Sequence, residues 1–402
     1  MFVTRRLFDE DSHLYDFTAS VLTCEPGRTD GTYLVTLDRT AFFPEGGGQA
    51  ADPGVLGGAN VLDVRVDKAG LITHTVDAPL PVGTAVDGHL DRAVREERMQ
   101  CHSGEHVVSG IIHRRFGFSN VGFHLGEDDV TLDFDGVLDR AQLDEIEDEA
   151  NRIIRASVPV TAYYPSPDEL AAMTYRSKLD LTEDVRIVRI GGGIGGDGEV
   201  YDTCACCAPH VRHTGEIGLV KLLDFIHYKG GIRIHMAAGV RALHDYRARY
   251  TAVSAIAAAM SVKQAEVLTG FDRLSAQVEK DKAVITSLRR ELQDLKIAAL
   301  PGTTGSLCLF EDEADALTMR QLLNRAVHKC GGICGVFVGN DQSGYAYVIG
   351  RAREDVDLRQ YAASVRAALN AKGGGSSEML QGRAAASRAV IQDFFDNLTL
   401  TL

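Results

Sequence analysis

Alternating apolar and polar positions characterise the first part of the chain. Residues 32–37, 61–66 and 71–76 are short runs rich in β-branched side chains, and glycine, proline and aspartate separate them. This spacing is typical of a small barrel or sandwich of short strands. We therefore expect an N-terminal β-barrel-like subdomain over residues 1–90, with a glycine cluster at residues 46–48 between two of its strands.

A helical period replaces the alternation after this region. Over residues 92–116, apolar and histidine positions recur at steps of three and four, and residues 139–157 repeat the pattern. Residues 185–190, rich in β-branched side chains, resemble a strand. These patterns predict an α+β domain over residues 91–245.

Residues 246–300 form a third region, a helical arm with few helix-breaking residues. Its apolar positions follow alternating steps of three and four, and one aspartate interrupts them. The positions are Val267, Phe271, Leu274, Val278, Asp281, Ile285, Leu288, Leu292 and Leu295. Two interpretations stay open: a helix packed against its own chain, and the seam of a short coiled-coil dimer.

Residues 301–402 are expected to form a C-terminal α/β domain, so the fold class of the whole chain is α+β. Strand-like segments flank a hairpin-like turn at residues 340–344, and a glycine-rich loop at residues 373–377 precedes a final helix. The cysteines of this region are expected to be packed small residues: Cys308, Cys330 and Cys334.

The length, charge and cysteine content of the chain limit which classes of protein it can belong to. A length of 402 residues favours several domains. The formal charge of −14 argues against a large phosphate-binding surface. Apolar runs fall short of the ~20 residues of a membrane helix, and the N-terminus lacks the apolar stretch of a secretory signal. We expect a cytoplasmic protein without a membrane partner, whose eight cysteines do not form a disulfide framework.

Two residue pairs with the same spacing suggest a metal site. His102 and His106 are four residues apart on a predicted helix, so both can face one ion, and Cys206 and His210 are also four apart. Neutral imidazole and thiolate are ligands that Zn²⁺ prefers, which makes zinc the expected cofactor. Three other residues stay open as substitutes or supports: Cys204, Cys207 and His213.

A metallopeptidase is an alternative interpretation of residues 102–106, which fit the pattern H-x-x-E-H. In such enzymes the glutamate, here Glu105, activates a zinc-bound water. A downstream carboxylate would then be the third ligand, and Cys206 and His210 would have no role. We therefore disfavour this interpretation.

The glycine-rich segment over residues 40–52 is a second candidate site. Consecutive glycines at Gly46, Gly47 and Gly48 allow a ligand to approach the backbone closely, and Gln49 adds a side-chain amide. A flexible hairpin tip would have the same composition.

Three motifs in order resemble a known family. Residues 40–52, the His102/His106 pair and residues 206–218 are similar to the editing domain of alanyl-tRNA synthetases and to the freestanding alanyl-tRNA editing proteins. Residues 373–382 resemble the C-terminal domain shared by alanyl-tRNA synthetases and Asp-His-His phosphoesterases. Since no synthetase core precedes residue 1, the resemblance implies the long freestanding form, which hydrolyses tRNA(Ala) mischarged with serine or glycine.

The resemblance also implies roles for individual residues. Thr40 matches the position that helps to recognise the serine hydroxyl, and Gln49 with the adjacent glycines matches the wall beside the aminoacyl ester. The helical arm could support a homodimer. The implied zinc ligands are His102, His106, Cys206 and His210. The implied contacts to the tRNA elbow are Gly373, Gly374 and Gly375.

One departure from the family pattern lies at the metal. The family usually has Gly-Gly-Thr where this chain has Cys207, Ala208 and Pro209, and Pro209 offers no N–H donor. For hydrolysis we expect Gln49 and the glycine N–H groups to stabilise the carbonyl oxygen, with Glu105 as general base. Zinc could polarise water or orient the substrate, although four protein ligands are typical of a structural zinc. A non-catalytic tRNA-binding protein with a structural zinc is thus a second hypothesis.

Overall fold

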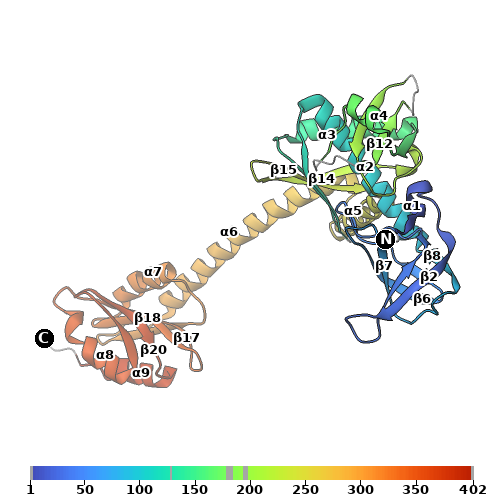
Figure 1. The fold of residues 1–402 in the computed structure, drawn as a ribbon. Coiled ribbons are helices and arrows are strands. Elements are labelled where there is room, and N and C mark those ends of the chain that lie inside the picture. The colour runs from blue at the N-terminus through green and yellow to red at the C-terminus, as the bar shows by residue number, and fades with distance from the viewer. Residues whose placement is uncertain (1–2, 127–128, 178–183, 193–197, 400–402) are drawn as a thin grey trace. The chain divides into compact units, whose positions relative to one another are not determined.

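The computed structural model describes residues 3–126, 129–177, 184–192 and 198–399. The chain divides into two compact units, Met1–Ala259 and Met260–Leu402 (Figure 1). Helices and strands occur in both units, and the first contains a closed barrel, which confirms the predicted α+β class. The finer division into four regions stays a prediction.

A six-stranded barrel opens the first unit. Its strands follow the order β2-β3-β7-β6-β5-β8. Along β2, alternate side chains Phe17, Ala19 and Val21 are buried in the barrel core, as the period of two requires. The bounds are β2 (Asp16–Pro26), β3 (Tyr33–Leu37), β5 (Gly54–Leu56), β6 (Ala59–Val66), β7 (Ile72–Val76) and β8 (Ala85–Leu90). Beside the barrel, β1 (Arg5–Arg6) pairs in parallel with β4 (Arg39–Thr40), and α1 (Leu7–Glu10) follows β1.

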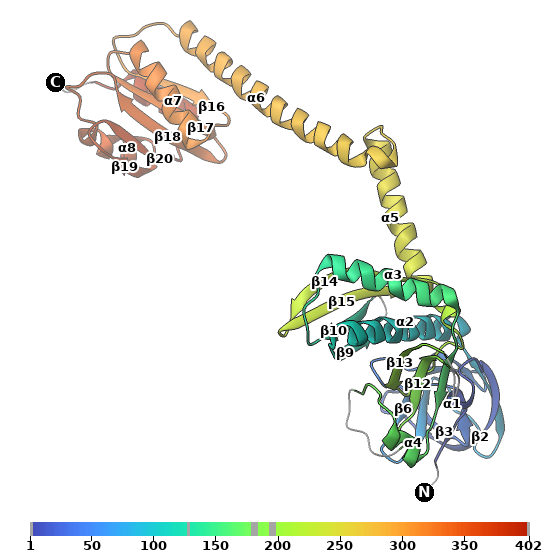
Figure 2. The ribbon, with the colours of Figure 1, turned by 90° about the horizontal axis from the view of Figure 1, so that it is seen from above.

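Helix α2 (Arg92–Phe116) forms the centre of the rest of this unit. Asp91 caps it by accepting a hydrogen bond from the Val94 N–H at 3.1 Å, and Gly117 ends it with a left-handed φ of 72°. Helix α3 (Arg140–Ala156) lies beside it (Figure 2). A four-stranded sheet has the order β14-β15-β10-β9, and a three-stranded sheet has the order β11-β12-β13.

The remaining bounds of the first unit are β9 (Asn120–Leu125), β10 (Val130–Phe134), β11 (Val160–Tyr163), α4 (Pro167–Ala172), β12 (Ile187–Gly191), β13 (Val200–Ala205), η1 (Thr214–Ile217), β14 (Val220–Tyr228), β15 (Gly231–Ala238) and α5 (Gly239–Ala259).

The predicted helical arm is not one continuous helix. Helix α5 ends at Ala259, and helix α6 (Val267–Ala299) begins after a short 3₁₀ turn, η2 (Gln264–Glu266). Ser261 between them has a φ of 54°. A left-handed residue cannot continue a right-handed helix, so the interruption follows from this backbone conformation.

The second unit contains one five-stranded sheet with a core on each face. The strand order is β16-β17-β18-β20-β19, and only β16 and β17 run parallel. Neighbouring Val336 and Phe337 on β17 point into different cores, one with α7 and the end of α6, the other with α8 and α9. The bounds are β16 (Leu307–Glu311), α7 (Ala316–Ala326), η3 (Val327–Lys329), β17 (Ile333–Asn340), β18 (Gly344–Arg351), η4 (Leu358–Gln360), α8 (Ala362–Ala368), β19 (Ala371–Gly375), β20 (Met379–Ala384) and α9 (Arg388–Asp396).

The prediction of a loop at residues 373–377 is partly wrong. Gly373, Gly374 and Gly375 belong to the edge strand β19, and only the following residues turn. Gly373 lies opposite Gly382 on β20, and a Cβ atom at either position would lie 2.7 or 2.8 Å from the Tyr347 hydroxyl. Glycine is therefore required by close packing inside a strand rather than by a flexible loop.

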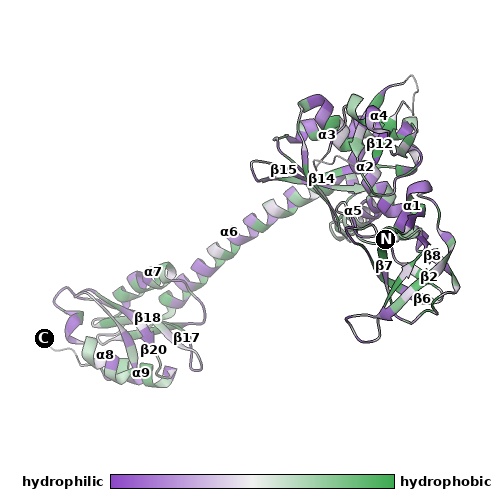
Figure 3. Cartoon of the chain, in the orientation of Figure 1, coloured by the Kyte–Doolittle hydropathy of each residue, from purple (hydrophilic) through white to green (hydrophobic). Residues whose placement is uncertain are grey.

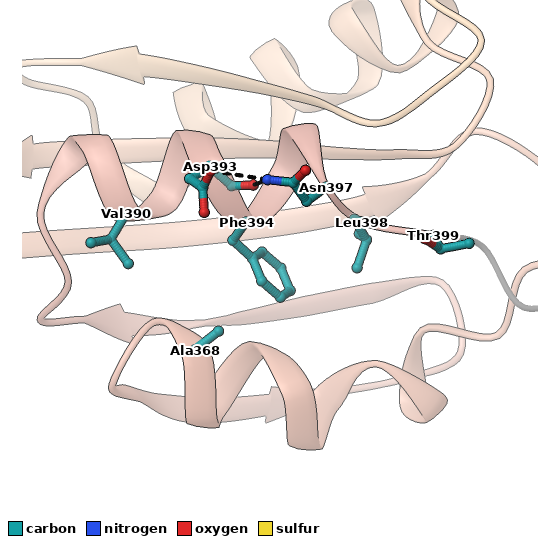
Figure 4. Close-up of a pocket in the computed structure, with 7 residues that line it drawn as sticks. All are labelled: Ala368, Val390, Asp393, Phe394, Asn397, Leu398 and Thr399. Atoms are coloured by element: carbon teal, nitrogen blue, oxygen red, sulfur yellow. Dashed lines mark hydrogen bonds between the residues drawn. The ribbon is translucent and has the colours of Figure 1, made fainter.

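Helices α8 and α9 enclose a small pocket of about 290 Å³, in which Phe394 points toward Ala368 (Figure 4). Asp393 and Asn397 on its rim bond to each other at 2.9 Å, so they are already paired. In the part of the chain that the structure describes, the helices are too short or too polar to cross a membrane.

Candidate metal centre

Helix α2 carries polar side chains into the interior of the first unit. His102, Glu105 and His106 retain 2%, 3% and 3% of their surface exposed. Burying such groups costs free energy unless each one finds a partner. The partners therefore indicate what the site is built to hold.

Cys206 and His210 come from the segment after β13. Arg186 on the neighbouring strand holds this segment in place, since its guanidinium donates to the carbonyl oxygens of Cys206 at 3.1 Å and Ala208 at 2.9 Å. The Cys206 N–H in turn donates to the Arg186 carbonyl oxygen at 3.0 Å. These contacts join main-chain atoms of the segment to Arg186, so they need no particular side chain at Cys207 or Pro209.

Four side chains meet at one point: His102, His106, Cys206 and His210, here called the His3Cys cluster. Their ligand atoms all lie within 4.8 Å of one another. The Cys206 Sγ is 3.5 Å from His102 Nε2 and 3.4 Å from His210 Nε2. A tetrahedron with Zn–N and Zn–S bonds of ~2.0–2.3 Å has edges of about 3.3–3.8 Å, so these separations fit one ion.

The opposite nitrogen of each ring has a partner of its own. His102 Nδ1 lies 3.0 Å from Gln49 Oε1, His106 Nδ1 3.0 Å from Asp202 Oδ2, and His210 Nδ1 3.0 Å from Ser103 Oγ. The acceptors Gln49 and Asp202 place the hydrogen on Nδ1, which leaves the Nε2 lone pair for a ligand. Partners of this kind orient the histidines of metal sites.

Asp202 is itself held by charge. Arg176 donates to both of its carboxylate oxygens at 2.7 Å, and this pairing outweighs burial and keeps the pKa of Asp202 below its ordinary value. Asp202 therefore stays an acceptor for the His106 ring. Strand β13 places Asp202 and Cys204 two residues apart on its buried face, and Cys206 follows directly after the strand ends.

The electrostatics of the cluster suit a cation. Burial alone would raise the pKa of Cys206, but His102 and the hydrogen bonds from the His102 and His106 rings outweigh it and hold the pKa well below the ordinary value of a thiol. Burial lowers the pKa of His210 to about 3, so this ring is neutral. Burial would lower the pKa of His106, but Glu105, Cys204 and Asp202 together raise it well above the ordinary value, so a cation must displace a proton there. The donor set can therefore hold a metal ion.

The structure separates the other candidate ligands from this group. Cys204 is buried beside His106 and Asp202, in a second possible group of three. Cys207 is exposed, and its Sγ lies 3.8 Å from where a Cβ at Gly47 would be. His213 is exposed and forms an ion pair with Glu216 at 3.7 Å. Among the described residues, Cys206 is the cysteine that the geometry groups with all three histidines.

Glu105 lies next to the cluster. Its Oε1 accepts hydrogen bonds at 2.6 Å from both Ser109 and Asn120, and its Oε2 lies 3.7 Å from His106 Nε2. The carboxylate therefore faces the ligand side of the His106 ring rather than solvent.

The glycine segment meets the cluster through Gln49, which retains 1% of its surface exposed. Its Oε1 is bonded to His102, whereas its Nε2 has no hydrogen-bond partner among the described residues. The loop itself is tied to β9, because the Leu125 N–H donates to the Gly48 carbonyl oxygen at 2.8 Å. A Cβ at Gly48 would lie 2.4 Å from the Phe123 carbonyl oxygen, and its φ is 82°, so glycine is required.

Thr40 lies on the barrel side of this segment with none of its surface exposed. Its hydroxyl is 2.9 Å from His74 Nε2 and accepts from the Phe42 N–H at 3.1 Å. Burial lowers the pKa of His74 to about 4, so this ring is neutral and accepts the Thr40 hydroxyl hydrogen. Sequence reasoning missed His74, since it stands 34 residues from its partner.

Sequence reasoning also missed the residues that fix the glycine segment. Arg95 and Asp52 form an ion pair with 0% and 1% of their side chains exposed. Arg95 also donates to the carbonyl oxygens of Ala41 and of Ser12, the latter at 2.8 Å. Arg95 stands seven residues, two helical turns, before His102, and this spacing could have placed it on the same helix face.

Comparisons with known proteins show what this chain is similar to. Residues 185–235, which include Cys206 and His210, match the family described as the threonyl and alanyl tRNA synthetase second additional domain. The alanyl-tRNA editing protein AlaX-L of Pyrococcus horikoshii is 28% identical over 309 residues, 74% of this chain and 74% of that protein. The chain is a relative of the AlaX-type alanyl-tRNA editing proteins. This confirms the resemblance predicted from the motifs.

Alanine–tRNA ligases are similar over more of this chain but less of their own length. The ligase of Halobacterium salinarum is 30% identical over 372 residues, 86% of this chain and 38% of the ligase. That of Ignicoccus hospitalis is 26% identical over 388 residues, 92% of this chain and 40% of the ligase. The chain spans about two fifths of the length of these ligases.

Proposed function

We propose that this AlaX-type relative is a deacylase that hydrolyses the ester of tRNA(Ala) mischarged with serine or glycine. The tRNA substrate and the editing activity in this proposal are taken from the names of the similar proteins. The observation that carries the proposal is the Gln49 amide, buried beside the His3Cys cluster with an unpartnered Nε2. A buried donor without a partner is costly, and a substrate carbonyl oxygen would satisfy it.

In this proposal the His3Cys cluster holds zinc, because three imidazoles and a thiolate are a donor set that zinc prefers. Bound zinc supplies a Lewis acid that can polarise a substrate oxygen or a water. Gln49 donates from Nε2 to the ester carbonyl, and the Gly46–Gly48 backbone lets the ester approach. Glu105, 3.7 Å from His106 Nε2, is the general base.

We propose further contacts on the basis of the resemblance. Thr40 would accept a hydrogen bond from the serine hydroxyl, since its own hydrogen is directed to His74. In the second unit, the exposed edge strand β19 would contact tRNA through Gly373–Gly375. Exposed Lys372 and Arg383 lie opposite each other in the register beside these glycines, and their charge suits phosphate.

Helix α6 supports the proposal of a homodimer. Its apolar stripe is exposed, with Leu274 at 54%, Ile285 at 50% and Leu288 at 58% of their surfaces. Figure 3 shows that hydrophobic and hydrophilic residues alternate along α6. Within the second unit only Gly270 and Ile297 of this helix are buried. A second copy of the helix would cover the stripe, as in a coiled coil.

The H-x-x-E-H peptidase alternative loses support, because the two histidines are grouped with Cys206 and His210 instead of a downstream carboxylate. A deacylation assay distinguishes the proposed enzyme from the alternative, a non-catalytic tRNA-binding protein with a structural zinc. Seryl-tRNA(Ala) should release labelled serine, and a zinc chelator should stop the release, while alanyl-tRNA(Ala) and seryl-tRNA(Ser) stay intact. Full zinc content without release would favour the non-catalytic alternative.

A further inference from the structure

The outer face of the three-stranded sheet β11-β12-β13 carries a row of polar side chains that the metal centre does not use. Val188 and Ile190 of β12 pack into the core that α2 also lines, so Arg189 between them lies on the opposite face. The register places Thr161 of β11 and Thr203 of β13 directly opposite Arg189, one on each side. Cβ atoms of directly opposite residues lie about 5 Å apart, so the three side chains are neighbours.

Two atoms of this row lack the partners that buried polar groups need. The Thr161 Oγ1 and Arg189 Nε atoms are both buried, and neither has a hydrogen-bond partner among the described residues. Within residues 3–126, 129–177, 184–192 and 198–399, Arg189 also forms no ion pair, whereas Arg233 on β15 pairs with Asp133 at 2.6 Å. Burying unpaired donors costs free energy, and a ligand that accepts from both would remove this cost.

The surroundings of the row leave it open to a ligand. Thr161, Arg189 and Thr203 each retain part of their surface exposed, so the row can be reached from outside the sheet. Gly192 lies beside the guanidinium with a φ of 61°, and a Cβ there would be 3.4 Å from Arg189 Nη2. Glycine at this position therefore keeps a side chain from crowding the guanidinium.

We infer that the row of Thr161, Arg189 and Thr203 binds a phosphate group. A guanidinium donates to two phosphate oxygens at once, and a threonine hydroxyl on each side can donate to a further oxygen. Three donor side chains are more than the two oxygens of a carboxylate can use, which favours a tetrahedral anion. Asp202 of β13 lies on the buried face of the same sheet, so this site is separate from the metal centre and does not depend on the proposed function.

The first test measures the unfolding temperature of the first unit by calorimetry of the full chain, with inorganic phosphate added at constant ionic strength. Phosphate should raise this temperature in the wild type, because it binds the folded state. Arg189→Met should weaken the phosphate affinity about tenfold, since it removes the charged donor. Arg233→Met is the matched control, because that guanidinium is already paired with Asp133, and it should keep the wild-type affinity. No shift in the wild type, or an equal affinity in Arg189→Met, would overturn the inference.

Thr161→Val gives a second readout that needs no ligand. An unpaired buried hydroxyl costs free energy, so replacing it with a methyl group should raise the unfolding temperature in phosphate-free buffer and also weaken phosphate binding. Thr23→Val is the matched control, since the Thr23 hydroxyl lies 2.7 Å from that of Thr36 and its loss should lower the unfolding temperature. If Thr161→Val lowers this temperature as the control does, its hydroxyl already has a partner and the inference is wrong.

Filter binding of uncharged tRNA(Ala) distinguishes two sources of the phosphate. If an RNA backbone supplies it, Arg189→Met should weaken tRNA binding, and inorganic phosphate should compete with tRNA for the wild type but not for the variant. If a free phosphate or a small phosphate ester is the ligand, Arg189→Met should lose phosphate binding and keep its affinity for tRNA. Both outcomes support the phosphate site, and neither depends on whether the chain deacylates seryl-tRNA(Ala).

Discussion

Helix α2 buries 14 of its 25 residues, among them two histidines, a glutamate and an arginine, whereas helix α6 buries two of its 33. The polar groups of α2 all have partners on other elements, and His102 and His106 direct their remaining nitrogens at Cys206 or near it. The apolar groups of α6 face outward, with Leu292 at 54% and Leu295 at 63% exposed.

Each helix thus carries residues that its own unit does not fully accommodate. Buried imidazole nitrogens are costly without a ligand, and exposed leucines in a stripe are costly without a covering surface. For α2 the missing component is a small cation, because the ligand atoms of the four side chains all lie within 4.8 Å of one another. For α6 it is another macromolecular surface, because the stripe is long and open. Substitutions can test each half of this comparison.

The largest expected effect comes from Cys206→Ala. The variant removes the only sulfur of the His3Cys cluster, so we expect zinc affinity to fall by more than ~100-fold and deacylation to be lost. Calorimetry of the full chain should show a lower unfolding temperature for the first unit and an unchanged one for the second. Cys207→Ala is the matched control, since that thiol is exposed. A full zinc content in Cys206→Ala would refute the assignment of this ligand.

Gln49→Glu distinguishes the role of the Gln49 Oε1 acceptor from that of the Nε2 donor. A carboxylate still accepts from His102 Nδ1, but it cannot donate to a substrate carbonyl. We expect zinc content to be kept and kcat to fall by ~10²–10³, the usual cost of removing one donor to a developing oxyanion. Glu45→Gln, in the same loop and paired with exposed Arg65, should leave kcat unchanged. An unaltered kcat in Gln49→Glu would show that the amide only orients His102.

Asp202→Asn tests whether the residue that accepts a hydrogen bond from His106 contributes to zinc binding. The variant keeps the shape of the side chain but weakens its acceptance from His106 Nδ1 and its pairing with Arg176. Zinc affinity should fall ~10–100-fold, as for other partners of metal-binding histidines. Asp133→Asn is the control, because Asp133 forms the same two-pronged pair with Arg233 at 2.6 and 2.7 Å, on β10 and β15. Equal zinc affinities in both variants would contradict the orienting role.

The sequence predicted those parts of the fold and the site that a local period determines. Alternation located the barrel strands, and the spacing of four found His102 and His106 because neighbouring helix turns share a face. Cys206 and His210 have the same spacing, but they lie in an irregular segment after β13. The sequence pattern could not predict the hydrogen-bond partners of the histidines. Gln49 is 53 residues from His102 and Asp202 is 96 from His106, and only tertiary packing brings them together.

Local patterns also failed where one residue departs from its neighbours. Within the predicted helical arm, α5 and α6 are separate helices, and Ser261 between them has a left-handed backbone that the surrounding helix-forming residues do not reveal. The glycines at residues 373–375 suggested a loop, but they form the edge strand β19 because they pair with β20, and a Cβ at Gly373 would lie 2.2 Å from the Gln381 carbonyl oxygen of that strand. In both cases the cause is not visible in the short stretch of sequence from which a helical or strand period is read.

The smallest effect is expected from Leu288→Lys on α6. Leu288 is 58% exposed in the single chain, so about half of its surface is left to bury against a second copy. One charge per chain in that seam should raise the dimer dissociation constant about tenfold and leave zinc content and deacylation unchanged. Leu317→Lys on α7 is the matched control, because Leu317 is 66% exposed outside the stripe. Sedimentation across micromolar concentrations measures the shift. If the wild-type chain stays monomeric over this range, a second copy of the chain does not cover the α6 stripe. The covering surface would then come from a different partner, and the comparison of α2 with α6 would hold only for α2.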